Sequence, residues 1–140
     1  MKIPKKWHKF ILPFLAYHRV IVYISVAKNR IANGRTGSSM VKLVAMFKTP
    51  EDVQKFDSHY NEIHAPLVRK WPGLRKFEVA RITGAPIGEP KHYLIAEMYF
   101  DSQDALQRAL ASAEGKAAAR DVMDFAGNLV SMFYADVNEG

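Results

Sequence analysis

Two histidines that lie close together in this 140-residue chain suggest proton-transfer or metal chemistry. His59 and His64 lie five residues apart in FDSHYNEIHAPLVRKWPG, residues 56–73. An imidazole ring titrates near neutral pH, so it can act as a general acid or base or bind a metal. Five residues turn an α-helix by about 140°, so the two rings are expected on different faces. The zinc motif H-E-x-x-H requires a spacing of four, and this segment does not contain it.

His64 is the better candidate of the two for catalysis. Asp57, Tyr60 and His64 stand at positions i, i+3 and i+7, which share one face of a helix. Pro66 disfavours helical geometry just before it, so His64 is expected at a helix end or a kink, beside a pocket. We therefore predict His64 as a catalytic acid or base with Asp57 and Tyr60 as partners, and His59 as a surface residue. The alternative is a helix-terminal histidine that the helix dipole stabilises.

Glu97 is the second unusual group, because it stands in the apolar segment LIAEMY. A buried carboxylate must be paired, or its pKa must shift. One interpretation is a salt bridge to Arg81 or Arg75. The other is a polar anchor for a ligand, with Tyr93, Tyr99 and Arg81 as further ligand-binding residues. Tyrosines in such strands are also typical of a core or an interface, so both interpretations stay open.

No cofactor and no metal are predicted. The chain contains no cysteine, which excludes disulfides, thiolate metal sites and a cysteine nucleophile. It has no glycine-rich loop of the P-loop or Rossmann kind. A metal or haem on His64 would need a second ligand at a suitable spacing, and the sequence offers none. The lack of cysteine fits a reducing compartment, and we expect a cytoplasmic protein.

The elements that must position these residues follow an α+β pattern. An apolar strand is predicted at 41–47, and TPED after it predicts a helix start with Thr49 as N-cap and Pro50 at N1. A helical apolar stripe follows, then two strands, a helix interrupted near 112–115, and a last strand. This order is the ferredoxin-like β-α-β-β-α-β motif with a four-stranded antiparallel sheet. The remaining strands are predicted at 74–82, 92–100 and 129–137. The stripe comprises Val53, Phe56, Tyr60, Ile63 and Leu67.

Two of the predicted strands, 92–100 and 129–137, are apolar on both faces. Two helices can cover only one face of the sheet, so the other face needs a second layer. We therefore expect a homodimer packed sheet to sheet, with a small apolar organic molecule bound in the shared interior.

The positive charge of the chain is confined to its N-terminal part. Residues 1–40 carry eight Lys or Arg and no acid, whereas residues 41–140 carry 12 basic and 14 acidic residues. A mildly acidic domain argues against a nucleic-acid partner. RNA-recognition motifs share the β-α-β-β-α-β order, but the third strand lacks their basic and aromatic pattern.

Residues 1–39 are predicted to be an N-terminal extension outside the fold, and residues 40–140 to be the domain. Residues 10–27 form an apolar run long enough for a membrane anchor or signal peptide. Arg19 at its centre costs about 2.5–3.5 kcal/mol of insertion free energy, which offsets most of the apolar gain. We favour the extension, with membrane contact through residues 10–27 as the alternative.

The segment from Met40 to Asp136 resembles the EthD family, named for ethyl tert-butyl ether degradation. The resemblance rests on H-x-P-L after the first helix, PGLR-x-x-E at the turn into the second strand, and AE-x-Y-F-D-S at the end of the third. It implies a dimeric α+β barrel with a cavity between two sheets. It also implies an oxidoreductase-like or accessory protein of an oxidative degradation pathway.

Relatives of that family include cofactor-free monooxygenases, isomerases and dehydratases, in which a cavity histidine often performs the acid–base step. The resemblance carries that role onto His64. Whether the chain is an enzyme stays open. The alternatives are a non-catalytic dimeric barrel with a ligand-binding or stability role, and a cofactor-free isomerase or dehydratase.

Overall fold

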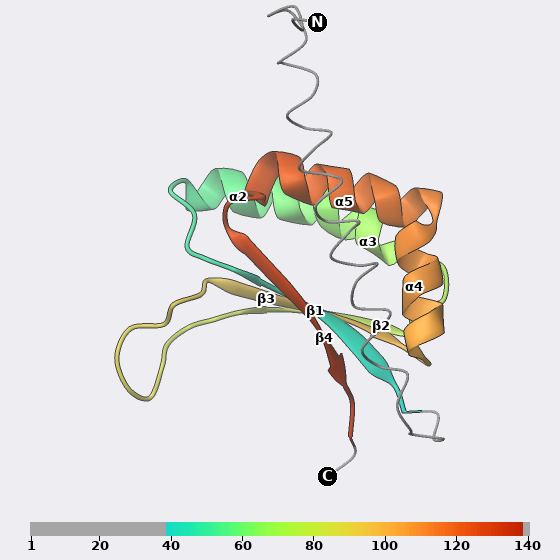
Figure 1. Cartoon of the computed structure of the whole chain (residues 1–140). Helices are drawn as coiled ribbons and strands as arrows, with labels where there is room; N and C mark the ends of the chain where they lie inside the picture. Colours follow the sequence, from blue (N-terminus) through green and yellow to red (C-terminus); the bar gives the residue numbers. More distant parts are fainter. Residues whose placement is uncertain (1–38, 139–140) are drawn as a thin grey trace, which may run out of the picture. The chain divides into compact units, whose positions relative to one another are not determined.

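The computed structural model describes residues 39–138 (Figure 1). The predictions for residues 1–38, including the apolar run at 10–27, lie outside this part. The described elements follow the predicted order, with the first helix in three pieces. They are β1 (Val41–Phe47), α2 (Val53–His59), the π-helical turn η2 (Tyr60–His64), α3 (Ala65–Arg69), β2 (Lys76–Arg81), β3 (Leu94–Phe100), α4 (Gln103–Ala111), α5 (Ala113–Ala126) and β4 (Val130–Asp136).

The four strands form one antiparallel sheet in the order β2-β3-β1-β4. Val41 at the start of β1 lies opposite Phe100 of β3 and opposite Asp136 of β4. The helices cover one side of this sheet (Figure 1). The predicted α+β class and ferredoxin-like β-α-β-β-α-β order are therefore confirmed.

The core lies between this sheet and the helices. Alternate residues of β3 are buried and half-buried, as expected for a strand with one face toward a core. Phe47 of β1, Phe100 of β3 and Leu106 of α4 are among the largest fully buried side chains. Burial of each such side chain contributes about 1.5–3 kcal/mol to stability, so this face fixes the register of the sheet.

The second helical segment breaks where the sequence predicted an interruption. Ser112 lies between α4 and α5 in an extended conformation, and its hydroxyl accepts a hydrogen bond from the Gly115 amide at 3.0 Å. A serine in this position is a typical N-cap. Gly115 packs so closely that a Cβ there would collide with the Ala109 carbonyl oxygen, which explains the glycine.

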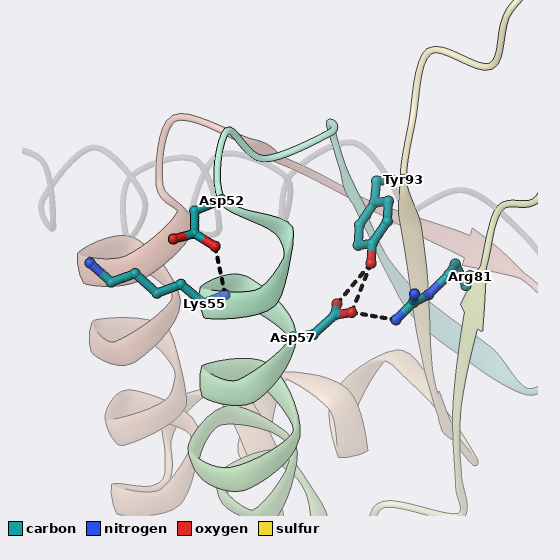
Figure 2. Close-up of polar contacts among 5 residues, drawn as sticks. All are labelled: Asp52, Lys55, Asp57, Arg81 and Tyr93. Carbon is teal, nitrogen blue, oxygen red and sulfur yellow. Dashed lines mark hydrogen bonds and ion pairs between the residues drawn. The ribbon is translucent and has the colours of Figure 1, made fainter.

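The first helix differs from the prediction at its start. Its N-cap is Asp52, which accepts a hydrogen bond from the Lys55 amide at 2.9 Å, and not Thr49 (Figure 2). Both residue types cap helices well, so the sequence alone could not choose between them.

The sequence allowed a helix end or a kink at His64, and the structure has a π-helical turn there. The Ala65 amide donates to the Tyr60 carbonyl, which is the i to i+5 pattern of a π-helix. Pro66 then takes a place in the first turn of α3, where its missing N–H has the lowest cost. The chain therefore continues as a helix to Arg69.

The π-helical turn contains one residue more than a regular α-helical turn, and this shifts the buried stripe along the chain by one position. The predicted stripe continued through Ile63 and Leu67, but Ile63 is 49% exposed. His64 and Val68 are buried instead. The π-turn thus turns a histidine, rather than an isoleucine, toward the interior.

The face of the sheet away from the helices carries charged and apolar side chains side by side. Lys42 and Glu97 form an ion pair of 2.6 Å on neighbouring strands, and Tyr99 lies beside them. The strand registers add Lys76 and Glu78 at one edge. The apolar members of this face, which we call the open face, are Val44, Met46, Ala80, Ile95, Phe133 and Ala135. Within residues 39–138, no helix has the length and apolar character needed to cross a membrane.

Candidate functional site

His64 lies in the helix layer with only 6% of its surface exposed. Its Nδ1 atom is 2.9 Å from Oδ2 of Asp121, which projects from α5. Asp121 was not among the predicted site residues, because 57 residues separate it from His64 in the chain. The structure therefore supplies an acidic partner for His64 that spacing within one helix could not indicate.

His59 is the second partner of the same carboxylate, which corrects its assignment as a surface residue. Its Nε2 atom lies 2.7 Å from Oδ1 of Asp121, and its side chain is 30% exposed. The separation of about 140° assumed a regular α-helix. In a π-turn, residues five apart occupy neighbouring positions on one side of the helix. His59 and His64 are therefore a pair.

The shared carboxylate fixes which nitrogen of each ring carries a proton. An ionised carboxylate only accepts hydrogen bonds, so the nitrogens that face Asp121 must be N–H groups. These are Nε2 of His59 and Nδ1 of His64. In the neutral form of His64, the proton acceptor is then Nε2.

Aromatic rings enclose the pair. Phe125, one helical turn after Asp121 on α5, stacks on His59 with ring centroids 4.3 Å apart and planes at 25°. The same ring lies 5.3 Å from His64, and the Tyr60 ring lies 5.3 Å from His64 as well. One α5 face thus provides both the charge and the apolar wall of the site.

Burial decides the electrostatics of His64. It lowers the pKa of His64 below the ordinary 6.5, because desolvation penalises the charged ring. Asp121 acts in the opposite direction, and His59 adds to the lowering. Burial also raises the pKa of Tyr60 above its ordinary value of 10. Near neutral pH, His64 is therefore a neutral ring and the Tyr60 phenol keeps its proton.

Asp57, a predicted partner of His64, lies in a different cluster (Figure 2). Its carboxylate accepts hydrogen bonds from the Tyr93 hydroxyl at 2.9 Å and from the Arg81 guanidinium. The Arg81 guanidinium carbon also lies 5.1 Å from the centroid of the Tyr93 ring. This corrects the placement of Asp57 beside His64, since the helix positions were counted without the π-turn. These contacts connect α2 with Arg81 at the end of β2 and with Tyr93 just before β3.

Tyr93 and Glu97 lie on opposite sides of the sheet. Tyr93 immediately precedes β3 and packs edge-on against Phe56 of α2, at a centroid distance of 5.9 Å. Glu97 and Tyr99 lie on the open face, where Glu97 pairs with Lys42 and not with Arg81 or Arg75. The hydrogen bond that Lys42 donates to the Glu97 carboxylate raises the pKa of Lys42.

The sheet therefore separates two groups of predicted site residues. Glu97 and Tyr99 belong to the open face. His64, Tyr60 and the Asp57 cluster belong to the helix side, where Tyr60 packs against Phe47 of the core. A single site that contains both His64 and Glu97 is excluded by this arrangement. In the part of the chain that the structure covers, no group of three or more His, Asp or Glu side chains could hold a metal ion, and this includes His59, His64 and Asp121.

The family model of the EthD domain matches residues 48–128, which contain the first helix, the histidine pair and all of α5. This match covers more than half of the chain. The chain belongs to the EthD family.

Relatives of this EthD chain agree with that assignment. An uncharacterized 11.0 kDa protein in the thcB-thcC intergenic region of Rhodococcus erythropolis is 34% identical over 97 residues, covering 69% of this chain and 94% of the relative. The crystal structure of an EthD family protein from Bacillus halodurans is 50% identical with a TM-score of 0.69, covering 71% of this chain and 99% of that one.

Two more distant structures share the fold. A dimeric protein of unknown function with a ferredoxin-like fold from Bacteroides fragilis is 20% identical with a TM-score of 0.53, covering 70% of this chain and 96% of that one. SnoaB, a cofactor-independent oxygenase from Streptomyces nogalater, is 17% identical with a TM-score of 0.51, covering 73% of this chain and 94% of that one. These similarities concern the fold, which carries many different functions.

Proposed function

We propose that this EthD protein binds a small apolar organic molecule on the helix side of its sheet, and that His64 acts on it as a general acid or base. The observation that carries the proposal is the His64–Asp121 contact of 2.9 Å. A carboxylate on Nδ1 orients an imidazole and leaves Nε2 as the base, as in hydrolase triads. A buried, neutral ring whose pKa is perturbed is typical of functional sites.

The surroundings of His64 support an apolar ligand. Tyr60 and Phe125 lie beside the ring, and half-buried His59 connects it to the solvent side. Asp121 takes the partner role expected of Asp57. Tyr60 remains a candidate hydrogen-bond donor, because its protonated phenol can donate to a developing negative charge.

We further propose that the protein is a cytoplasmic homodimer formed through the open face. A sheet with helices on one side exposes its other face, and Phe133 on that face is 47% exposed. The distant fold relative from Bacteroides fragilis is described as dimeric. In such a dimer Glu97 and Tyr99 would line the interior between the sheets, as a polar anchor separate from His64.

The reaction class that we favour is oxidoreductase-like chemistry, or an accessory role, in an oxidative degradation pathway. Its support is membership of the EthD family, together with a fold that also occurs in a cofactor-independent oxygenase. Proton abstraction by His64 would equally serve a cofactor-free isomerase or dehydratase. The products of turnover distinguish these reactions.

The experiment uses the purified full-length chain and a panel of ethyl tert-butyl ether, toluene, phenol and a small lactone. Binding is followed by ligand-detected NMR, and products by gas chromatography with mass spectrometry in air. His64→Gln should keep the binding but lose at least about 10²-fold in turnover, the usual contribution of a general acid or base. His92→Gln is the matched control and should behave as wild type. Unchanged turnover in His64→Gln would refute the catalytic role.

A non-catalytic role is the second candidate, and the dense ring packing favours it. Phe56, Tyr60, His59 and Phe125 lie at centroid distances of 4.3–6.5 Å from one another where they contact, as in a structural core. In that case a panel compound would bind without being consumed. His64→Gln would then lower the melting temperature and change nothing else.

A further inference from the structure

One carboxylate serves two imidazole rings in the helix layer. Each oxygen of Asp121 has its own ring, Oδ1 with His59 at 2.7 Å and Oδ2 with His64 at 2.9 Å. Phe125 lies against both rings, at centroid distances of 4.3 and 5.3 Å. The π-turn brings the two rings to the same side of the helix. The arrangement is therefore a coupled unit, and not two separate ion pairs.

A single negative charge can balance only one imidazolium. His59 is 30% exposed and keeps contact with water, whereas the His64 side chain is 8% exposed. The charged and titratable groups that act on His64 are Asp121 from α5 and His59 from α2. Tyr60 from η2 contacts the ring, and Arg69 from α3 acts on the Tyr60 phenol. A proton added to the pair is therefore better accommodated on the solvent-side ring.

We propose that Asp121 is a positioning residue that sets the tautomers of both rings at once, and that His59 tunes His64 through it. Burial already favours the neutral form of His64, and a charge on His59 opposes a second charge beside it, so Nε2 of His64 stays the proton acceptor. His59 thereby becomes a functional residue of the site without itself contacting a substrate. The importance of this coupling for catalysis rests on the proposed function, whereas the coupling itself does not.

The test is a ¹H–¹⁵N NMR titration of the histidine rings in the full-length protein, compared with His59→Gln and Asp121→Asn. Glutamine at position 59 can still donate a hydrogen bond to Oδ1 but cannot become charged. We expect His64 in the wild type to be the Nδ1–H tautomer. Its titration should move to higher pH in His59→Gln, and to lower pH in Asp121→Asn with loss of that tautomer. His92 serves as the reference ring in the same spectra.

Two results would overturn the inference. One is an identical His64 titration in the wild type and in His59→Gln. The other is an Nε2–H tautomer of His64 in the wild type. If Asp121→Asn fails to fold, the His59→Gln comparison alone decides. Coupling without turnover of any panel compound would reject the proposed catalysis and keep this inference. Turnover that depends on His64 without any coupling would reject this inference and keep the proposed catalysis.

Discussion

His64 should make the protein lose stability as the pH falls from about 7 to 5. Burial lowers the pKa of His64 in the folded state below the ordinary 6.5, so the unfolded chain binds this proton first. The free energy of unfolding then declines below about pH 6.5, and the decline stops once the folded form is also protonated. One proton limits the slope to about 1.4 kcal/mol per pH unit.

Substitution of His64 by glutamine should remove this slope. The measurement is urea unfolding followed by circular dichroism, at several pH values between 5 and 7 and at one protein concentration. Asp and Glu titrate mainly below this window, which isolates the histidine contribution. His92→Gln is the matched control and should keep the wild-type slope. Parallel stability curves for wild type and His64→Gln would show that burial does not disfavour the charged ring.

Three further substitutions test the structural assignments. Asp57→Ala should reduce the free energy of unfolding by about 1–3 kcal/mol, because the Tyr93 hydroxyl loses its charged acceptor. Leu106→Ala should reduce it by about 2–5 kcal/mol, since this side chain is fully buried. Gly73→Ala should reduce it by about 1–2 kcal/mol, because Gly73 has a φ of +75°. Gly84 has open space around it and no positive φ, so Gly84→Ala should change the free energy of unfolding by less than about 0.5 kcal/mol.

All four substitutions, including the Gly84→Ala control, are measured by the same urea unfolding at neutral pH. If Asp57→Ala had the same free energy of unfolding as the wild type, the Asp57 cluster would not stabilise the contact between α2 and the sheet. A loss below about 1 kcal/mol for Leu106→Ala would contradict the position of α4 in the core. Equal effects of the two glycine substitutions would remove the conformational explanation for Gly73.

The fold could be predicted from the sequence because its strands and helices carry strong local signals. The strand predicted at 41–47 coincides with β1, and the strand predicted at 92–100 contains β3. Ser112 interrupts the second helix where the sequence suggested it. These features depend on apolar alternation and on capping residues, which act over a few neighbours. Local signals therefore sufficed for the architecture.

The site was harder to predict because it depends on one irregular turn and one distant residue. Ile63 continues the apolar period, so nothing in the pattern marks the π-turn. Asp121 approaches His59 and His64 only through the packing of α5 against the first helix. His64 was identified as the candidate base, whereas its partner and the role of His59 needed tertiary structure. Their catalytic roles stay predictions.

The π-turn changes how sequences of this family should be aligned. Residues 61–63 are exposed, so one of them can be lost without disturbing a buried contact. A relative that lacks this extra residue would form a plain α-helix, where positions i and i+4 are neighbours. H-x₃-H in such a relative would then be the spatial equivalent of the H-x₄-H that His59 and His64 form here. In an alignment, a one-residue gap at this place beside H-x₃-H would then be compatible with the same pair of neighbouring rings.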